Sequence, residues 1–209
     1  MIKKNKMHEY TIHNGKFIGK FEELYKDFKD PFAQTKIEKF ETTKKIILNY
    51  CQMIKDKKKN KIKTFEIGCG FGKLTKDLNK LGFNSSGMDI SKTAIKKART
   101  NSKCKFYVSD LLNYDLYLKV NPDIIIMPEV TWYILPQLKP FLNFLRKNFK
   151  NKYLIHTLAT YEDRRQKYGR DYFKNLEGIL KYFNLNYIEY GQKYDTKINE
   201  SRTFFLAKI

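Results

Sequence analysis

The segment FEIGCGFGKLT, from Phe65 to Thr75, decides the fold class of this 209-residue chain. A short apolar run leads into Gly68, Gly70 and Gly72, and a helical pattern follows. Glycines at a strand-to-helix turn let backbone amides approach a ligand without obstruction by a Cβ atom. The segment predicts a ligand-binding loop at the end of a buried strand. The alternative is a strand, turn and helix with incidental glycines.

On the carboxyl side of this segment, short apolar runs alternate with amphipathic stretches, which is typical of parallel βαβ units. We expect helices near 136–148 and 171–183. We also expect strands near 62–67, 84–88, 104–108, 123–127, 152–158, 186–192 and 202–208. The pattern predicts an α/β, Rossmann-like fold with a seven-stranded, mostly parallel sheet and helices on both faces.

The N-terminal part of the chain has helical periodicity. Residues 21–28 and 37–54 each carry one apolar stripe, and Pro31 separates the two stretches. A helix with a single apolar stripe needs another surface to bury it. We therefore predict that residues 1–60 form an N-terminal helical lid on the domain of residues 61–209, rather than a domain of their own.

Composition excludes several classes of protein. Hydrophobic residues make up 42% of the chain, but no apolar run approaches the roughly 20 residues of a membrane helix. The polar opening lacks the apolar centre of a signal peptide, so we expect a cytoplasmic protein without membrane insertion. The three cysteines are odd in number and far apart, which indicates neither a disulfide framework nor a metal site.

The net charge of +20 is the unusual bulk property. Such a charge attracts nucleic acid, anionic lipid or phosphorylated substrates. Only six of the 42 basic residues are arginine, however, and arginine is the side chain that reads phosphates and bases bidentately. We interpret much of the charge as codon bias of an AT-rich genome, and the run from Lys55 to Lys63 as a solvated linker.

A second motif accompanies the glycine segment. Glu66 precedes the glycines, and Asp89 ends the next expected strand in GMDIS. With these residues the chain, from about 62 to 209, resembles the class I S-adenosylmethionine (SAM)-dependent methyltransferases. The resemblance implies that the glycine loop surrounds the methionine part of SAM and that Asp89 accepts hydrogen bonds from both ribose hydroxyls.

The third expected strand ends in YVSDLLNYD. The resemblance implies that Asp110 meets the adenine amino group and that Leu111 reads the ring, although an Asp after a strand also commonly caps a turn. The cofactor residues that the resemblance implies are Glu66, Gly68, Cys69, Gly70, Gly72, Asp89, Ile90, Asp110, Leu111 and Pro128.

The fourth expected strand, in PDIIIMPEVTWYIL, leads to the candidate catalytic residues. Glu129 follows the strand, where a carboxylate can take a proton from the acceptor, hold the loop or contact SAM. Tyr133 can cover the sulfonium through cation–π attraction or simply pack, and for Trp132 we favour cover. His156, in the next strand, is the third candidate, either as a base or as a core residue.

The loop from Thr160 to Arg170 follows a strand, where open α/β sheets place ligand-contacting loops. Tyr161, Arg164 and Arg165 are candidate acceptor-binding residues, because guanidinium groups suit an anionic acceptor. The alternative is a solvated loop.

A narrower resemblance lies in YKDFKDPFAQTKIEKFETTKK together with PEVTWYIL. It is to nodulation-factor N-methyltransferases and related bacterial enzymes that modify sugars and surface polysaccharides, except that Pro128 replaces their small polar residue.

These observations predict methyl transfer from SAM, with S-adenosylhomocysteine (SAH) as product, to O or N of a small polar acceptor. The acceptor we expect is a nucleotide-linked sugar or a phosphorylated precursor of capsule or other surface polysaccharide. An RNA or protein methyltransferase is the first alternative. Only the net charge supports it, and no Asn-Pro-Pro-aromatic tetrad follows the fourth strand. A non-catalytic SAM-binding protein is the second.

Overall fold

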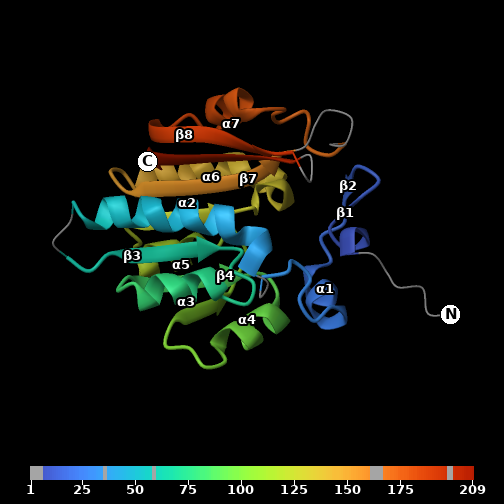
Figure 1. The fold of residues 1–209 in the computed structure, drawn as a ribbon, viewed down its shortest axis with the longest axis horizontal. Coiled ribbons are helices and arrows are strands. Elements are labelled where there is room, and N and C mark those ends of the chain that lie inside the picture. The colour runs from blue at the N-terminus through green and yellow to red at the C-terminus, as the bar shows by residue number, and fades with distance from the viewer. Residues whose placement is uncertain (1–6, 35–36, 58–59, 161–166, 197–199) are drawn as a thin grey trace.

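The computed structural model describes residues 7–34, 37–57, 60–160, 167–196 and 200–209. Its centre is a seven-stranded sheet in the order β5-β4-β3-β6-β7-β9-β8 (Figure 1). Strand β9 runs antiparallel to both of its neighbours, and the other pairs are parallel. The strands are β3 (Lys63–Ile67), β4 (Asn84–Asp89), β5 (Lys105–Val108), β6 (Ile124–Pro128), β7 (Tyr153–Thr160), β8 (Asn186–Asp195) and β9 (Glu200–Lys208).

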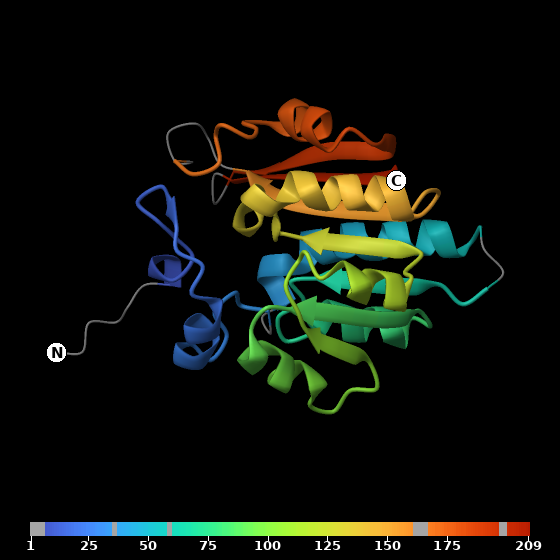
Figure 2. The same ribbon diagram turned by 180° about the vertical axis from the view of Figure 1, so that it is seen from behind.

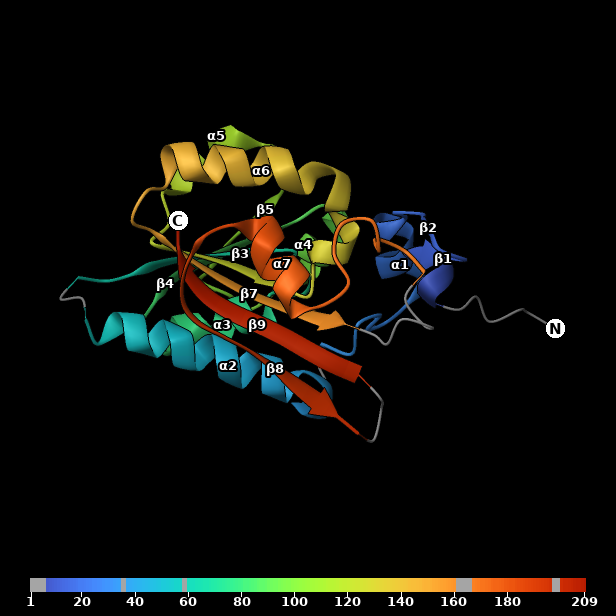
Figure 3. The ribbon, with the colours of Figure 1, turned by 90° about the horizontal axis from the view of Figure 1, so that it is seen from above.

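Helices cover both faces of this sheet, in three layers (Figure 3). One face carries α2 (Ile37–Lys55), α3 (Lys73–Lys80) and α4 (Lys92–Arg99), and the other carries α5 (Tyr114–Val120), α6 (Leu135–Asn148) and α7 (Leu176–Phe183). Residues 124–127 of β6 are fully buried, as a strand packed on both faces requires. The predicted fold class is confirmed.

The strand order places a crevice beside β3. The chain moves from β3 outward to β4 and β5, then crosses back to β6 on the other side of β3. In open α/β sheets, ligands bind outside the carboxyl ends of the strands at such a switch point. The topology therefore predicts a ligand site at the carboxyl ends of β3, β4 and β6.

The expected helix at 171–183 is shorter than predicted and begins at Leu176. The Asn175 side chain accepts a hydrogen bond from the Gly178 backbone N–H, so Asn175 caps the helix and fixes its start. The sequence analysis also missed a hairpin of β1 (Ile12–His13) and β2 (Lys16–Phe17). Its turn residues, Asn14 and Gly15, have φ angles of 50° and 73°, which suit a tight hairpin turn.

The expected N-terminal lid divides into two parts. Helix α1 (Phe21–Asp27) and the β1–β2 hairpin lie beyond the carboxyl ends of the strands, where a lid belongs (Figures 1 and 2). Helix α2 instead lies along the sheet and buries Ile47 and Ile54 against the Ile124 and Ile155 side chains of β6 and β7. Helix α2 is thus a layer of the main domain. Among the described residues, no helix is long and apolar enough to cross a membrane.

Candidate active site

A cavity of about 800 Å³ opens at the carboxyl ends of the strands. Residues of β3, β4, β6 and their following turns form one wall, and residues of the N-terminal segment and α2 face them. Of the residues named in the sequence analysis, the cavity lining includes the cofactor candidates Glu66, Gly68, Cys69, Asp89, Ile90, Asp110, Leu111 and Pro128, the catalytic candidates Glu129 and Tyr133, and Trp132. Residues up to 67 positions apart in the sequence, Glu66 and Tyr133, are thereby brought to one place.

Gly70 and Gly72 shape the turn beneath this cavity. Their φ angles of 52° and 70° are left-handed, a region that side chains with a Cβ rarely adopt. A Cβ on Gly72 would lie 2.4 Å from the Phe106 ring, and a Cβ on Gly70 would lie 2.1 Å from the Gln34 carboxamide. Both positions therefore favour glycine for conformation, and Gly72 needs it for space as well, because the buried Phe106 ring cannot move aside as the end of the Gln34 side chain can.

Asp89 stands at the end of β4 with a fixed carboxylate. Its Oδ2 accepts a hydrogen bond from the Gly70 N–H and its Oδ1 accepts one from the Ser91 N–H, both at 2.9 Å. Burial raises the pKa of Asp89, and these backbone hydrogen bonds oppose the rise. Each oxygen keeps a further lone pair, so the carboxylate fits a vicinal diol in the cavity.

Glu66 is buried and braces the glycine loop from below. Its Oε2 accepts hydrogen bonds from the backbone N–H and the hydroxyl of Thr75, which ties β3 to the first turn of α3. Burial raises the pKa of Glu66 to about 8, although both hydrogen bonds from Thr75 oppose this. Through these contacts Glu66 stabilises the glycine loop. Glu66 also lines the cavity.

The wall beyond Asp89 combines apolar and polar groups. The Ile90 side chain is 55% exposed and lines the cavity, which gives a planar ring an apolar surface to lie against. Asp110 Oδ1 accepts a hydrogen bond from the Leu112 N–H at 2.8 Å. The turn-capping role considered for Asp110 is thus present, and the residue lines the cavity as well.

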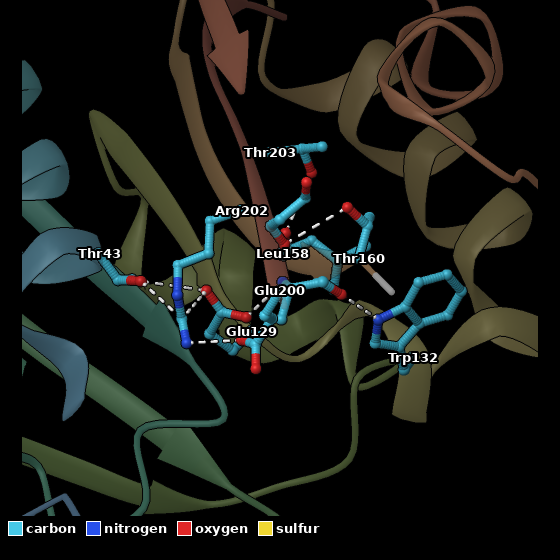
Figure 4. A network of polar contacts seen from close by, with 10 residues as sticks. Thr43, Glu129, Trp132, Leu158, Thr160, Glu200, Arg202 and Thr203 are labelled. Carbon is cyan, nitrogen blue, oxygen red and sulfur yellow. Dashed lines mark hydrogen bonds and ion pairs between the residues drawn. The ribbon is translucent and has the colours of Figure 1, made fainter. Parts of the chain in front are cut away.

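Glu129 also lines the cavity and lies in a partly buried polar network (Figure 4). Its Oε2 accepts a 2.6 Å hydrogen bond from the Ala159 N–H, and its Oε1 lies 3.1 Å from both the Thr43 hydroxyl and Arg202 Nη1. Arg202 Nη2 also contacts Glu200 at 2.8 Å. Burial raises the pKa of Glu129, and Arg202 opposes the rise. Holding the loop, one of the roles considered for Glu129, is what these contacts do.

The two aromatic residues after β6 have different surroundings. Trp132 donates from Nε1 to the Ala159 carbonyl at 2.7 Å, and its ring lies 5.2 Å from that of Phe173. Tyr133 packs edge-on against Phe21 of α1, with ring centroids 5.2 Å apart. Trp132 therefore supports the wall, whereas Tyr133 joins that wall to the N-terminal segment.

His156 must be removed from the candidate bases. Its side chain is fully buried between the rings of Phe183 and Phe205, and its Nε2 lies 2.8 Å from the Thr131 hydroxyl. Burial lowers the pKa of His156 to about 3. The imidazole does not line the cavity, so His156 is a residue of the core, which is the alternative to a base for a lone histidine in an apolar strand.

The candidate acceptor-binding residues Tyr161, Arg164 and Arg165 lie outside the described residues.

Several residues at the site were missed by sequence reasoning. From the N-terminal segment, Tyr25 lines the cavity, and Gln34 Oε1 accepts a hydrogen bond from the Phe71 N–H at 2.8 Å. Glu200 and Arg202 come from the last strand. No local motif marks these positions, because each depends on a partner far away in the sequence.

Comparisons with known proteins show the family and the fold. A family model described as "Methyltransferase domain" matches residues 57–161. A comparison with curated protein sequences finds no match.

Three methyltransferases are among the solved structures that share the fold. The N-methyltransferase NodS from Bradyrhizobium japonicum WM9, in complex with SAH, has a TM-score of 0.66 at 16% identity over 87% of this chain and 92% of that chain. The bifunctional kinase-methyltransferase WbdD has a TM-score of 0.67 at 16% identity over 86% of this chain, which spans 41% of WbdD. The SAH complex of the magnesium protoporphyrin IX methyltransferase ChlM from Synechocystis PCC 6803 has a TM-score of 0.58 at 16% identity, over 80% and 81% of the two chains.

Proposed function

The chain belongs to the class I SAM-dependent methyltransferases, and we propose that it methylates O or N of a small polar acceptor, a nucleotide-linked sugar or a phosphorylated precursor of a surface polysaccharide. The observation that carries the proposal is the single cavity of about 800 Å³ that contains both Asp89 and Glu129. One end has the fixed carboxylate for a ribose, and the other has polar groups for an acceptor. Such a cavity has the size of a small-molecule site.

The residues of this chain fit the cofactor. Asp89 would accept the ribose hydroxyls, Ile90 and Leu111 would lie against the adenine, and the left-handed glycine turn would leave room for the methionine part. When bound, SAM supplies the methyl group. The chain mainly has to hold the acceptor in line and exclude water, to which the packing of Tyr133 on α1 contributes.

Two observations support the proposed class of acceptor. Lys44, Lys45 and Lys73 line the cavity with side chains that are 37%, 74% and 50% exposed, so the outer part of the cavity suits a phosphate group. The motif resemblance to sugar-modifying methyltransferases points the same way. An RNA or protein acceptor has only the net charge of +20 in its favour.

The proposal is tested in two steps. Calorimetry should detect SAH binding to the purified protein, and labelled SAM should then transfer its methyl group to a nucleotide sugar or a phosphorylated metabolite. Label in RNA or protein alone would replace the acceptor class. SAH binding without label in any acceptor would favour the non-catalytic alternative, and no binding would contradict the cofactor assignment.

A further inference from the structure

The cavity is lined by more acidic than basic residues, whereas the whole chain has more basic than acidic residues. Of the described residues that line it, six are acidic and four are basic, whereas the chain has 22 acidic and 42 basic residues. The acidic members are Glu41, Glu66, Asp89, Asp110, Glu129 and Glu200, and the basic members are Lys44, Lys45, Lys73 and Arg202. Glu66, whose pKa burial raises to about 8, is mostly uncharged at neutral pH, so five acidic and four basic groups remain. The cavity therefore lacks the large positive excess of the whole chain.

The imbalance is concentrated in a triad at the Glu129 end. The carboxylates of Glu129 and Glu200 both contact the one guanidinium of Arg202, at 3.1 and 2.8 Å, and both face it in Figure 4. The three side chains are only 18%, 17% and 15% exposed. Two carboxylates and one guanidinium leave one negative charge, and a partly buried charge is costly unless it is paired.

The lysines that line the cavity near the triad form ion pairs with other carboxylates. Lys44 forms an ion pair with Asp77 at 2.6 Å, and Lys45 forms one with Glu41 at 2.9 Å. The hydroxyl of Thr43 contacts Glu129 but carries no charge. In the described part of the chain, the triad therefore keeps its excess negative charge toward the cavity.

We propose that the Glu129–Glu200–Arg202 triad binds a protonated amino group of the acceptor, and that the atom methylated is this nitrogen. The inference rests on the proposed function and narrows it to N-methylation of an amine that also carries an anionic group, such as a nucleotide-linked amino sugar. The ammonium would lie on the triad, and the phosphate would lie toward Lys44 and Lys73, which share the one carboxylate of Asp77 and so keep one positive charge in excess.

The proton balance suits the triad. The ammonium must lose one proton before its nitrogen can form the new N–C bond, and a carboxylate of the triad accepts that proton. The S–C bond of the donor breaks as the N–C bond forms, and its electron pair stays on sulfur. This proton transfer leaves the triad without excess charge, and the positive charge lost by the sulfonium appears on the methylated nitrogen. Release of the proton from the carboxylate to solvent then restores the negative charge of the triad.

The experiment compares matched acceptors that differ in one group: UDP-glucosamine with UDP-glucose, and glucosamine 6-phosphate with glucose 6-phosphate. Labelled SAM should methylate the amine of a pair and not its hydroxyl counterpart. The variant Glu200→Gln should raise the KM for the amine about tenfold, because one charged hydrogen bond is lost. The affinity for SAH should stay within about twofold of the parent, since Glu200 lies at the far end from Asp89.

The control variant is Glu177→Gln, which makes the same change in net charge at an exposed position on α7 and should alter neither constant. A second readout needs no acceptor: in Glu200→Gln, the pKa of Glu129 measured by carbon NMR should fall, because Arg202 then serves one carboxylate. Label in the hydroxyl compounds only, label in none while SAH binds, or an unchanged Glu129 pKa would overturn the inference. Loss of SAH binding by the parent would instead overturn the proposed function.

Discussion

The Ser91 hydroxyl donates a 2.7 Å hydrogen bond to the carboxylate of Glu22, across 69 positions of sequence. The same carboxylate accepts from the N–H and the hydroxyl of Thr93, so Glu22 of α1 covers the N-terminus of α4. Carboxylates are favoured there by the unpaired N–H groups and the helix dipole. Because Ser91 also donates its backbone N–H to Asp89, α1 is fastened directly beside the expected ribose site.

Replacing Glu22 with Gln should loosen this attachment in a pH-dependent way. Hydrogen bonds from Ser91 and Thr93 outweigh desolvation and lower the pKa of Glu22 from 4.5 to about 2. A lowered folded-state pKa stabilises the fold above the unfolded value, and this contribution is lost as the pH falls through about 2. The difference in Tm between parent and variant should therefore be present at pH 7 and shrink below pH 4.5. Glu23→Gln, exposed on the same helix, should show no such trend.

Replacing Asp89 with Asn should weaken SAH binding by about 100-fold, because hydrogen bonds to a charged group are each worth about 1.5 to 3 kcal/mol. Calorimetric titration measures the effect. Asp115→Asn changes the charge equally at an exposed position of α5 and should leave the affinity unchanged. Equal affinities of the Asp89 variant and the parent would remove Asp89 from the ribose site.

Replacing Gly72 with Ala should destabilise the fold more than the same change at Gly82. Both glycines are left-handed, with φ angles of 70° and 89°. A Cβ on Gly82 would meet only the end of the Lys55 side chain at 3.2 Å, whereas one on Gly72 would strike the Phe106 ring. We expect each variant to lose about 1 to 3 kcal/mol from backbone strain, with a further loss at Gly72. Urea unfolding checks this, and equal losses would contradict it.

Replacing His156 with Gln should make the free energy of unfolding depend less on pH between about 6.5 and 3. The unfolded chain binds a proton at His156 below about pH 6.5, but the folded chain does so only below about pH 3. The free energy of unfolding of the parent should thus fall as the pH drops through this range. The variant loses packing at neutral pH, but its deficit relative to the parent should narrow by pH 3. A deficit that stays constant would mean that His156 is not buried in its neutral form.

The amino-acid sequence alone predicts the fold class, which is confirmed, and the glycines and strand-end acids on which the expected cofactor site depends. These depend on local signals: alternating apolar runs, three spaced glycines, and acids at the ends of strands, as with Gly72 and Asp89. The strands lie within a few residues of their expected positions, because period and turn chemistry act over short stretches of chain. Parallel packing then brings those strand ends to one edge.

The burial and charge partners of the site residues, and the place of helix α2, depend on the tertiary structure. His156 within β7 and Glu129 after β6 are both polar residues beside apolar runs, but His156 is enclosed by Phe183 and Phe205 whereas Glu129 contacts Arg202. Helix α2 carries an amphipathic stripe that suits a lid or a sheet face equally well, and the packing of β6 and β7 selects the sheet. A side chain's burial and charge partners depend on residues dozens of positions away, and no local pattern contains that information.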